Sequence, residues 1–288
     1  MISSYSIKRR SFLKAAGIAG AAALLCGCGM SGAAGEDSAS GNAAASGKVT
    51  TGGSTSMEKL MSALREGFAE QYPSMDVTYN PTGSSAGITG AAEGALDIGL
   101  SSRKLKPAEN GVYAKTVALD GIAVIVNPGN ALTELTIDQL ADIFTGKITD
   151  WKEVGASSGK IVLIGREAGS GTRDGFEGIC GVTDSCVYTQ ELTATGAVVS
   201  AVAGNSLAIG YASLASLKDN VKAIGVEGVI CSEENVLNGS YAIQRPFNFI
   251  TKNDSVPSPA AKAFMEFAMS TDAADYIRAA GAVPMNGT

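Results

Sequence analysis

Three short predicted strands of this 288-residue chain each lead into a stretch rich in glycine, serine and threonine that opens a helix. The stretches are Gly52 to Ser56, Gly83 to Gly87 and Gly165 to Asp174. Strands followed at once by helices are typical of α/β layers, and open α/β sheets bind ligands where helices start after strand ends. The pattern therefore predicts an α/β fold with a ligand site at these helix starts.

The third stretch carries the residue types that bind oxyanions. Arg166 stands four residues before the Ser-Gly-Thr of residues 170–172. A helix N-terminus offers unpaired N–H groups and the positive end of the helix dipole, hydroxyls add donors, and arginine adds a planar fork. A single Ser-Gly-Thr is often only a turn and an N-cap, but three such helix entries favour anion binding. In the first entry, Thr55 and Glu58 also fit a capping box.

Four further segments stand in the order and rough spacing shown by one known family of binding proteins. They are Asp97 to Arg103, Ile143 to Trp151, Ala208 to Tyr211 and Arg245 to Phe247. Together with the Arg166 stretch they resemble the PstS family of phosphate-binding proteins, of the type II periplasmic-binding-protein superfamily. The resemblance implies a two-lobed α/β fold with the ligand cleft between the lobes. It also implies capture of inorganic phosphate and its delivery to an ABC permease, without enzymatic activity.

Carried over by position, the resemblance implies which residues contact the ligand. They are Ser54, Thr55, Ser56, Ser84, Ser102, Arg166, Ser170, Gly171 and Thr172. Some members of the family carry an Asp where this chain has Ser102, and that carboxylate accepts the proton of bound phosphate. The acceptor is therefore open here: Asp174 or Glu167 is a candidate, as is a hydroxyl or a backbone carbonyl.

Other functions stay as alternatives. Sulfate, molybdate or tungstate are rival ligands, although a buried acceptor for the phosphate proton would disfavour sulfate. A serine hydrolase using Ser170 or Ser84 is a different class, but the chain has no histidine, which excludes Ser-His-Asp triads and His-ligated zinc. We expect no metal and no cofactor. A phosphate-binding surface lipoprotein without a permease partner is the third alternative.

The N-terminus predicts export and lipid anchoring. Lys8 to Lys14 resembles a twin-arginine signal, and the apolar stretch Ala15 to Leu25 is too short for a stable membrane anchor. A lipobox-like sequence ends in Cys28, so residues 1–27 are predicted to be a signal peptide and Cys28 to be acylated. The glycine-, alanine- and serine-rich residues 28–47 read as a flexible tether. The expected location is the extracytoplasmic face of the cell membrane.

The exported protein is acidic. Loss of the signal peptide leaves 18 basic residues against 28 acidic ones, because all four charged residues of the signal are basic. Such a protein attracts neither nucleic acid nor anionic lipid over long range, so anion binding has to be local and buried. We expect a monomer whose partners are phosphate, the permease and, through its lipid anchor, the membrane.

The remaining cysteines and the single tryptophan have structural interpretations. In an extracytoplasmic protein, a loop disulfide between Cys180 and Cys186 is favoured over two free thiols. Cys231 is then a lone thiol packed as a small apolar residue. Trp151 follows a predicted helix in a turn, where a packing role is favoured over ligand stacking.

Hydrophobic periodicity orders the chain into two lobes. The predicted helices cover residues 57–71, 84–93, 137–144, 172–179, 197–203, 259–268 and 272–280, and the predicted strands 49–51, 75–79, 95–100, 116–127, 161–164, 207–211 and 241–250. This order predicts a discontinuous first lobe, residues 48–123 and 244–288, and a continuous second lobe, residues 124–243. Both lobes supply candidate site residues, so a bound ligand would bridge them and close a hinge.

Overall fold

The computed structural model describes residues 47–285. The predicted signal peptide, Cys28 and all but the last residue of the tether lie outside the described residues. Within residues 47–285, no helix combines the length and the apolar composition needed to cross a membrane.

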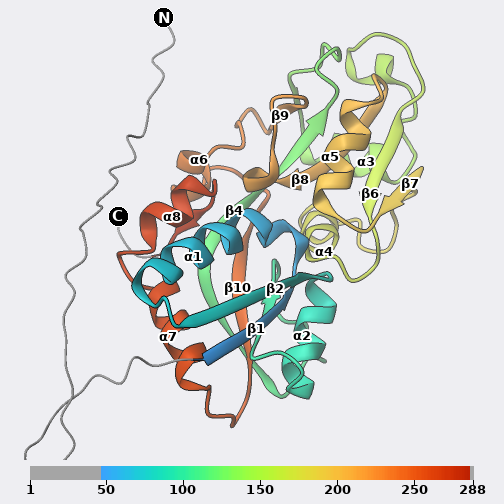
Figure 1. Ribbon diagram of the computed structural model, residues 1–288. Coiled ribbons are helices and arrows are strands. Elements are labelled where there is room, and N and C mark those ends of the chain that lie inside the picture. The colour runs from blue at the N-terminus through green and yellow to red at the C-terminus, as the bar shows by residue number, and fades with distance from the viewer. Residues whose placement is uncertain (1–46, 286–288) are drawn as a thin grey trace, which may run out of the picture. The chain divides into compact units, whose positions relative to one another are not determined.

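A mixed sheet in the order β2-β1-β3-β10-β4 forms the first lobe (Figure 1). Its strands are β1 (Gly47–Gly53), β2 (Met75–Pro81), β3 (Ile98–Ser101), β4 (Val112–Val126) and β10 (Gln244–Lys252), with the short β11 (Val283–Pro284) beside β4. β1 pairs in parallel with both β2 and β3. β10 returns antiparallel between β3 and β4. Because β1 and β3 are parallel neighbours, their carboxyl ends lie side by side.

Helices cover the first lobe on both faces of its sheet. They are α1 (Glu58–Gln71), which follows the 3-10 turn η1 (Thr55–Met57), α2 (Ser84–Glu93), α7 (Pro259–Ala268) and α8 (Ala274–Ala279). The apolar residues Leu60, Met61, Leu64 and Phe68 of α1 are buried, and Phe68 packs its ring against Phe264 at 5.2 Å between centroids. Burial of these aromatic side chains supplies much of the driving force for this lobe.

The second lobe is built on the far half of β4. The other strands of this sheet are β6 (Val162–Arg166), β7 (Gln190–Leu192), β8 (Ala208–Ser213) and β9 (Lys222–Val226), with β5 (Glu134–Leu135) beside β9. Its helices are α3 (Ile137–Phe144), α4 (Gly171–Ile179), α5 (Thr195–Ala203) and α6 (Glu233–Leu237), with 3-10 turns η2 (Trp151–Val154) and η3 (Leu214–Ser216). At its centre the ring of Phe176 stacks on that of Tyr211, and Phe144 packs edge-on against Phe176.

The long strand β4 joins the two lobes. Its residues up to Gly121 pair with β10, and its residues from Ile122 onward pair with β8. The apolar cores divide at the same place: Ala118 belongs to the first-lobe core, whereas Ile122 belongs to the second. The fold is thus the predicted α/β fold with two lobes.

The structure adds elements that periodicity does not reveal. β5, β7, β9, β11 and α6 contain two to five residues each. Segments this short hold no full hydrophobic repeat, so a sequence pattern cannot distinguish them from loops. Trp151 is buried, and its Nε1 donates a hydrogen bond to the Leu207 carbonyl oxygen at 2.9 Å, in agreement with the predicted packing role.

The disulfide predicted between Cys180 and Cys186 is absent, because both residues are free thiols, as is Cys231. The Cys180 side chain is buried at the end of α4, and the Cys186 thiol faces the Val182 carbonyl oxygen at 3.9 Å. Burial raises the pKa of Cys186 to about 11. In the structure the two side chains pack within the core of the second lobe without forming a crosslink.

Candidate anion-binding site

Three serine hydroxyls of the first lobe meet where β1, β3 and α2 come together. Ser54 follows β1, Ser84 opens α2 and Ser102 follows β3. The Ser54 hydroxyl donates to Ser102 Oγ at 2.8 Å, and Ser84 Oγ lies 3.2 Å from Ser102 Oγ. The Ser102 N–H also donates to Ser84 Oγ at 3.1 Å. These residues, all at most 2 % exposed, form a cluster that we call the serine cluster.

Glycines allow α2 to pack closely against the strands that carry the other two serines. A Cβ on Gly87 would lie 2.7 Å from the Leu100 carbonyl oxygen, and a Cβ on Gly53 would lie 2.2 Å from the same atom. Gly53 also has a φ of +134°, a conformation that L side chains rarely adopt. The glycine-rich entries predicted from the sequence therefore serve backbone packing as well as access to the site.

The start of α4 brings the second lobe to the serine cluster. A Cβ on Gly171 would lie 2.3 Å from Ser84 Oγ and 2.6 Å from Ser102 Oγ. Ser170 caps the helix by accepting a hydrogen bond from the Arg173 N–H at 3.4 Å. Thr172 Oγ1 lies 2.7 Å from Ser56 Oγ of the first lobe. Any larger residue at position 171 would displace the serine hydroxyls or push α4 away from them.

Two more hydroxyl contacts between the lobes are made by Thr195, the first residue of α5. Its Oγ1 lies 3.1 Å from both Thr55 Oγ1 and Ser56 Oγ. The Thr195 N–H also donates to Thr55 Oγ1 at 3.3 Å. The Thr55 hydroxyl therefore serves the other lobe, and the capping box predicted with Glu58 does not form, since neither η1 nor α1 has a side-chain cap.

Arg166 lies at the end of β6, only 1 % exposed, and is held by its neighbours. Glu167 accepts from its Nε at 3.0 Å and from its Nη2 at 2.8 Å, and the Leu192 carbonyl accepts from Nε at 3.0 Å. Nη1 donates to Thr195 Oγ1 at 3.0 Å. Glu167 thus orients the guanidinium with both of its oxygens, while Nη1 faces the hydroxyls of the site.

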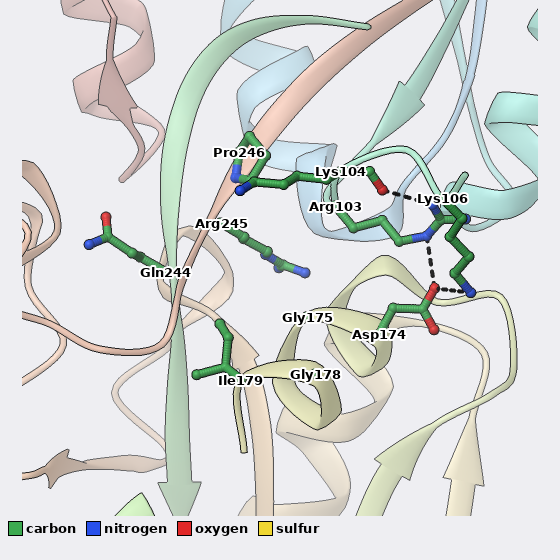
Figure 2. Close-up of a pocket in the computed structure, with 10 residues that line it drawn as sticks. All are labelled: Arg103, Lys104, Lys106, Asp174, Gly175, Gly178, Ile179, Gln244, Arg245 and Pro246. Carbon is green, nitrogen blue, oxygen red and sulfur yellow. Dashed lines mark hydrogen bonds and ion pairs between the residues drawn. The ribbon is translucent and has the colours of Figure 1, made fainter. Parts of the chain in front are cut away.

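Asp174 lines a cavity of about 340 Å³ beside the site. Its Oδ2 is 2.8 Å from Arg103 Nε and 2.8 Å from Lys106 Nζ, as Figure 2 shows. Asp174 belongs to α4 and both cations follow β3, so these ion pairs join the two lobes. A role of Asp174 or Glu167 as proton acceptor stays a prediction, and both carboxylates are already engaged with cations.

A buried ion pair that sequence reasoning missed adjoins the serine cluster. Arg245 on β10 donates from Nε and Nη2 to Asp120 Oδ2 on β4, at 3.0 and 2.9 Å. Its Nη1 donates to Ser102 Oγ at 3.2 Å. Ser213 donates to Asp120 Oδ1 at 2.7 Å. Burial raises the pKa of Asp120, an effect that the Arg245 charge and the Ser213 hydrogen bond oppose.

The sequence does contain features that point to Asp120, Arg245 and Thr195. Asp120 is the only charged residue in the apolar run 116–127, and Arg245 opens the Arg-Pro-Phe segment. Thr195 stands at a hydroxyl- and glycine-containing helix start of the same chemistry as the three recognised entries. The predicted residues Ser54, Ser84 and Ser102, by contrast, are brought into direct contact.

Comparisons with known proteins identify the family of this chain. Residues 38–272 match the family model of a PBP superfamily domain. The phosphate-binding protein PstS of Bacillus subtilis is 35% identical over 237 residues, which are 77% of this chain and 75% of that protein.

Solved structures of proteins named for phosphate transport are also similar to this chain. One from Clostridium perfringens, described as a phosphate ABC transporter substrate-binding protein with bound phosphate, is 40% identical with a TM-score of 0.80, covering 83% of this chain and all of that one. An ABC-type phosphate transport receptor from Vibrio cholerae is 34% identical with a TM-score of 0.69, covering 82% of this chain and 99% of its own. The chain therefore belongs to the PBP superfamily and, within it, to the PstS family of phosphate-binding proteins.

Proposed function

We propose that this protein captures inorganic phosphate outside the cytoplasmic membrane and delivers it to an ABC permease. The observation that carries the proposal is the convergence of hydroxyls from both lobes beside the buried Arg166. Its relatives with this fold are named for phosphate binding and phosphate transport. A tetrahedral anion fits such a site because helix N-termini, hydroxyls and a planar guanidinium all present hydrogen donors to it.

The helix starts explain why an acidic protein can bind an anion. The N-termini of α2, α4 and α5 all lie at the hydroxyl groups of the site, and these helices begin at Ser84, Gly171 and Thr195. Each helix start contributes partial positive charge and unpaired N–H groups over a short range. The attraction is therefore local, as the overall charge of the protein requires.

Delivery requires the ligand to be held and then released, which the division into lobes supports. We take residues 48–123 and 244–288 as one lobe and residues 124–243 as the other. The contacts Ser56–Thr172 and Thr55–Thr195 cross between them, as does the Ser85 N–H bond to the Gly169 carbonyl oxygen at 3.1 Å. Ligand donors on both sides favour a hinge that closes on phosphate and opens at the permease.

The proposal also covers the processing of the N-terminus and the oligomeric state of the protein. We infer that a signal peptidase removes residues 1–27, that Cys28 carries the lipid, and that the protein works as a lipid-anchored monomer without catalytic activity. In the described residues, the serines considered as nucleophiles pair with other groups: Ser84 with Ser102, and Ser170 with the Arg173 N–H. Neither of these partners is a general base, which argues against the hydrolase alternative.

Calorimetry tests the ligand. The protein is unfolded and refolded to strip bound anions, and then titrated with phosphate, arsenate and sulfate. Tight binding of phosphate and its analogue arsenate, with weaker binding of sulfate, is the expected result. A stripped protein that prefers sulfate over phosphate would show that the site serves another oxyanion.

A further inference from the structure

We propose that Arg245 is a second cation of the phosphate site and makes Ser102 a hydrogen donor, so that the site selects the phosphate dianion over the monoanion. The inference rests on the proposed function and concerns the same site. It identifies which protonation state of the ligand binds.

The hydrogen bonds of Ser102 carry the argument. A hydroxyl has one hydrogen to donate and two lone pairs to accept with. Ser102 Oγ receives hydrogen bonds from the Ser54 hydroxyl at 2.8 Å and from Arg245 Nη1 at 3.2 Å. Both lone pairs are then occupied, and the Ser102 hydrogen points toward Ser84 or toward a bound anion. A proton on the ligand finds no acceptor at this residue.

Arg245 is fixed in the position that this role requires. Its Nε and Nη2 are bound to one oxygen of Asp120, and the other oxygen accepts from Ser213. Arg245 and Asp120 are 4 % and 1 % exposed, so neither side chain can turn out to water. Nη1 is the guanidinium nitrogen left facing the serine cluster. An arginine in a protein cannot give up its proton, so this nitrogen remains a donor at every relevant pH.

Asp120 on β4 is the carboxylate paired with Arg245, and further cations lie around this pair. The Arg166 guanidinium on β6 is near enough to lower the pKa of Arg245, although burial is the larger cause. Cys231 also faces the pair, but burial raises its pKa far above neutrality and keeps it uncharged. The cavity shared with Arg245 is lined by Arg103, Lys104, Lys106 and Asp174. Cations thus outnumber carboxylates on the cavity side.

The chemistry of the ligand completes the inference. The phosphate monoanion carries two P–OH groups and the dianion only one. A P–OH facing Ser102 would meet donors instead of an acceptor, and an unpaired buried donor is costly. A carboxylate at this position would accept that proton, whereas the Ser102 and Arg245 pair favours an unprotonated oxygen.

Calorimetry of the full-length chain in mild detergent, with inorganic phosphate over a pH series that spans the second ionisation of phosphate, tests the inference. The dianion fraction falls tenfold per pH unit below that ionisation, so the apparent Kd should rise by about tenfold per unit there and level off above it. The matched variant Ser102→Asp restores an acceptor and should show a clearly flatter profile. A variant Arg245→Lys should bind phosphate at least about tenfold more weakly at high pH, because the fork that reaches Ser102 is lost.

Each result decides the matter. A parent profile that stays flat through the ionisation overturns the inference while leaving phosphate binding intact, and this holds even if the variants fail to fold. Equal slopes for the parent and Ser102→Asp would assign the pH dependence to other protein groups and also overturn it. A parent that binds no phosphate at any pH would instead refute the proposed function.

Discussion

At the scale of single residues, the site consists of hydroxyls that each have a defined partner. Ser84 pairs with Ser102 within the first lobe, and Thr172 pairs with Ser56 across the lobes. Each hydroxyl is therefore positioned before it meets a ligand. Positioned donors cost little to reorganise on binding, which favours high affinity.

Removing one of these donors should weaken phosphate binding without abolishing it. Thr172→Val and Ser84→Ala each delete one hydroxyl and should cost roughly 1–3 kcal/mol of binding free energy. Calorimetry measures the loss. Ser200→Ala, at an exposed hydroxyl on α5 that bonds to the Gly196 carbonyl, is a matched control that should bind as the parent does. Parent-like affinity for both site variants would remove these hydroxyls from the site.

The ion pair between Arg103 and Glu109 predicts how the stability of the folded protein depends on pH. Burial alone would raise the pKa of Glu109, but hydrogen bonds from Arg103 and the Lys106 N–H lower it below its usual value. A carboxyl with a lowered pKa in the folded state stabilises the protein above its unfolded pKa, and this contribution is lost as pH falls through the folded pKa.

Glu109→Gln should therefore lower the free energy of unfolding at neutral pH, by roughly 1–3 kcal/mol, because Arg103 loses its charged partner. The difference between parent and variant should shrink as the solution is acidified through the folded pKa of Glu109. Urea unfolding at a series of pH values measures it. A difference that persists unchanged in acid would contradict the assigned ion pair.

At the scale of elements, most of the framework was predictable. The predicted helix over residues 84–93 coincides with α2, and that over residues 259–268 coincides with α7. Regular apolar spacing and glycine breaks encode such elements locally. The contacts Arg245–Asp120 and Arg166–Thr195 were not predictable, because they join residues 125 and 29 positions apart that only the strand pairing brings together.

The start of α4 gives a test at this scale. Gly171→Ala places a Cβ 2.3 Å from Ser84 Oγ, so either the serine hydroxyls leave their positions or α4 moves away from the first lobe. Phosphate affinity should fall by about tenfold or more, since overpacking at such a contact costs about 1–3 kcal/mol. Calorimetry is the measurement.

Gly178 on the same helix provides the control. A Cβ there meets nothing within 4 Å, so Gly178→Ala should leave binding unchanged and stabilise the helix by about 0.5–1 kcal/mol. Equal affinity of Gly171→Ala and Gly178→Ala would show that α4 does not close on the serine cluster.

At the scale of the whole molecule, the proposed lipid anchor would hold a two-lobed binding protein at the membrane. The predicted lipobox places acylation on Cys28 and not on Cys26. Cys28→Ser should therefore release the protein from membranes or block its processing, whereas Cys26→Ser should do neither. Labelling with a fatty-acid analogue and membrane fractionation measure this, and continued labelling of the Cys28→Ser protein would disprove the anchor.

Contacts between the two lobes lie on either side of the candidate ligand site. Asp174 on α4 joins Arg103 and Lys106 of the first lobe at one end, and Thr195 joins Thr55 at the other. Arg166 lies buried among these contacts. We therefore expect its charge to contribute to both ligand capture and closure of the lobes.

The most direct measurement is the calorimetric titration of phosphate into stripped Arg166→Ala protein beside the parent. Removing this buried cation takes away one of the two arginines proposed to compensate the charge of bound phosphate, so binding should weaken by about 3–5 kcal/mol. Arg65→Ala, at an exposed arginine on α1, should bind as the parent does. Arg166→Ala protein that is folded and binds phosphate as tightly as the parent would contradict the account.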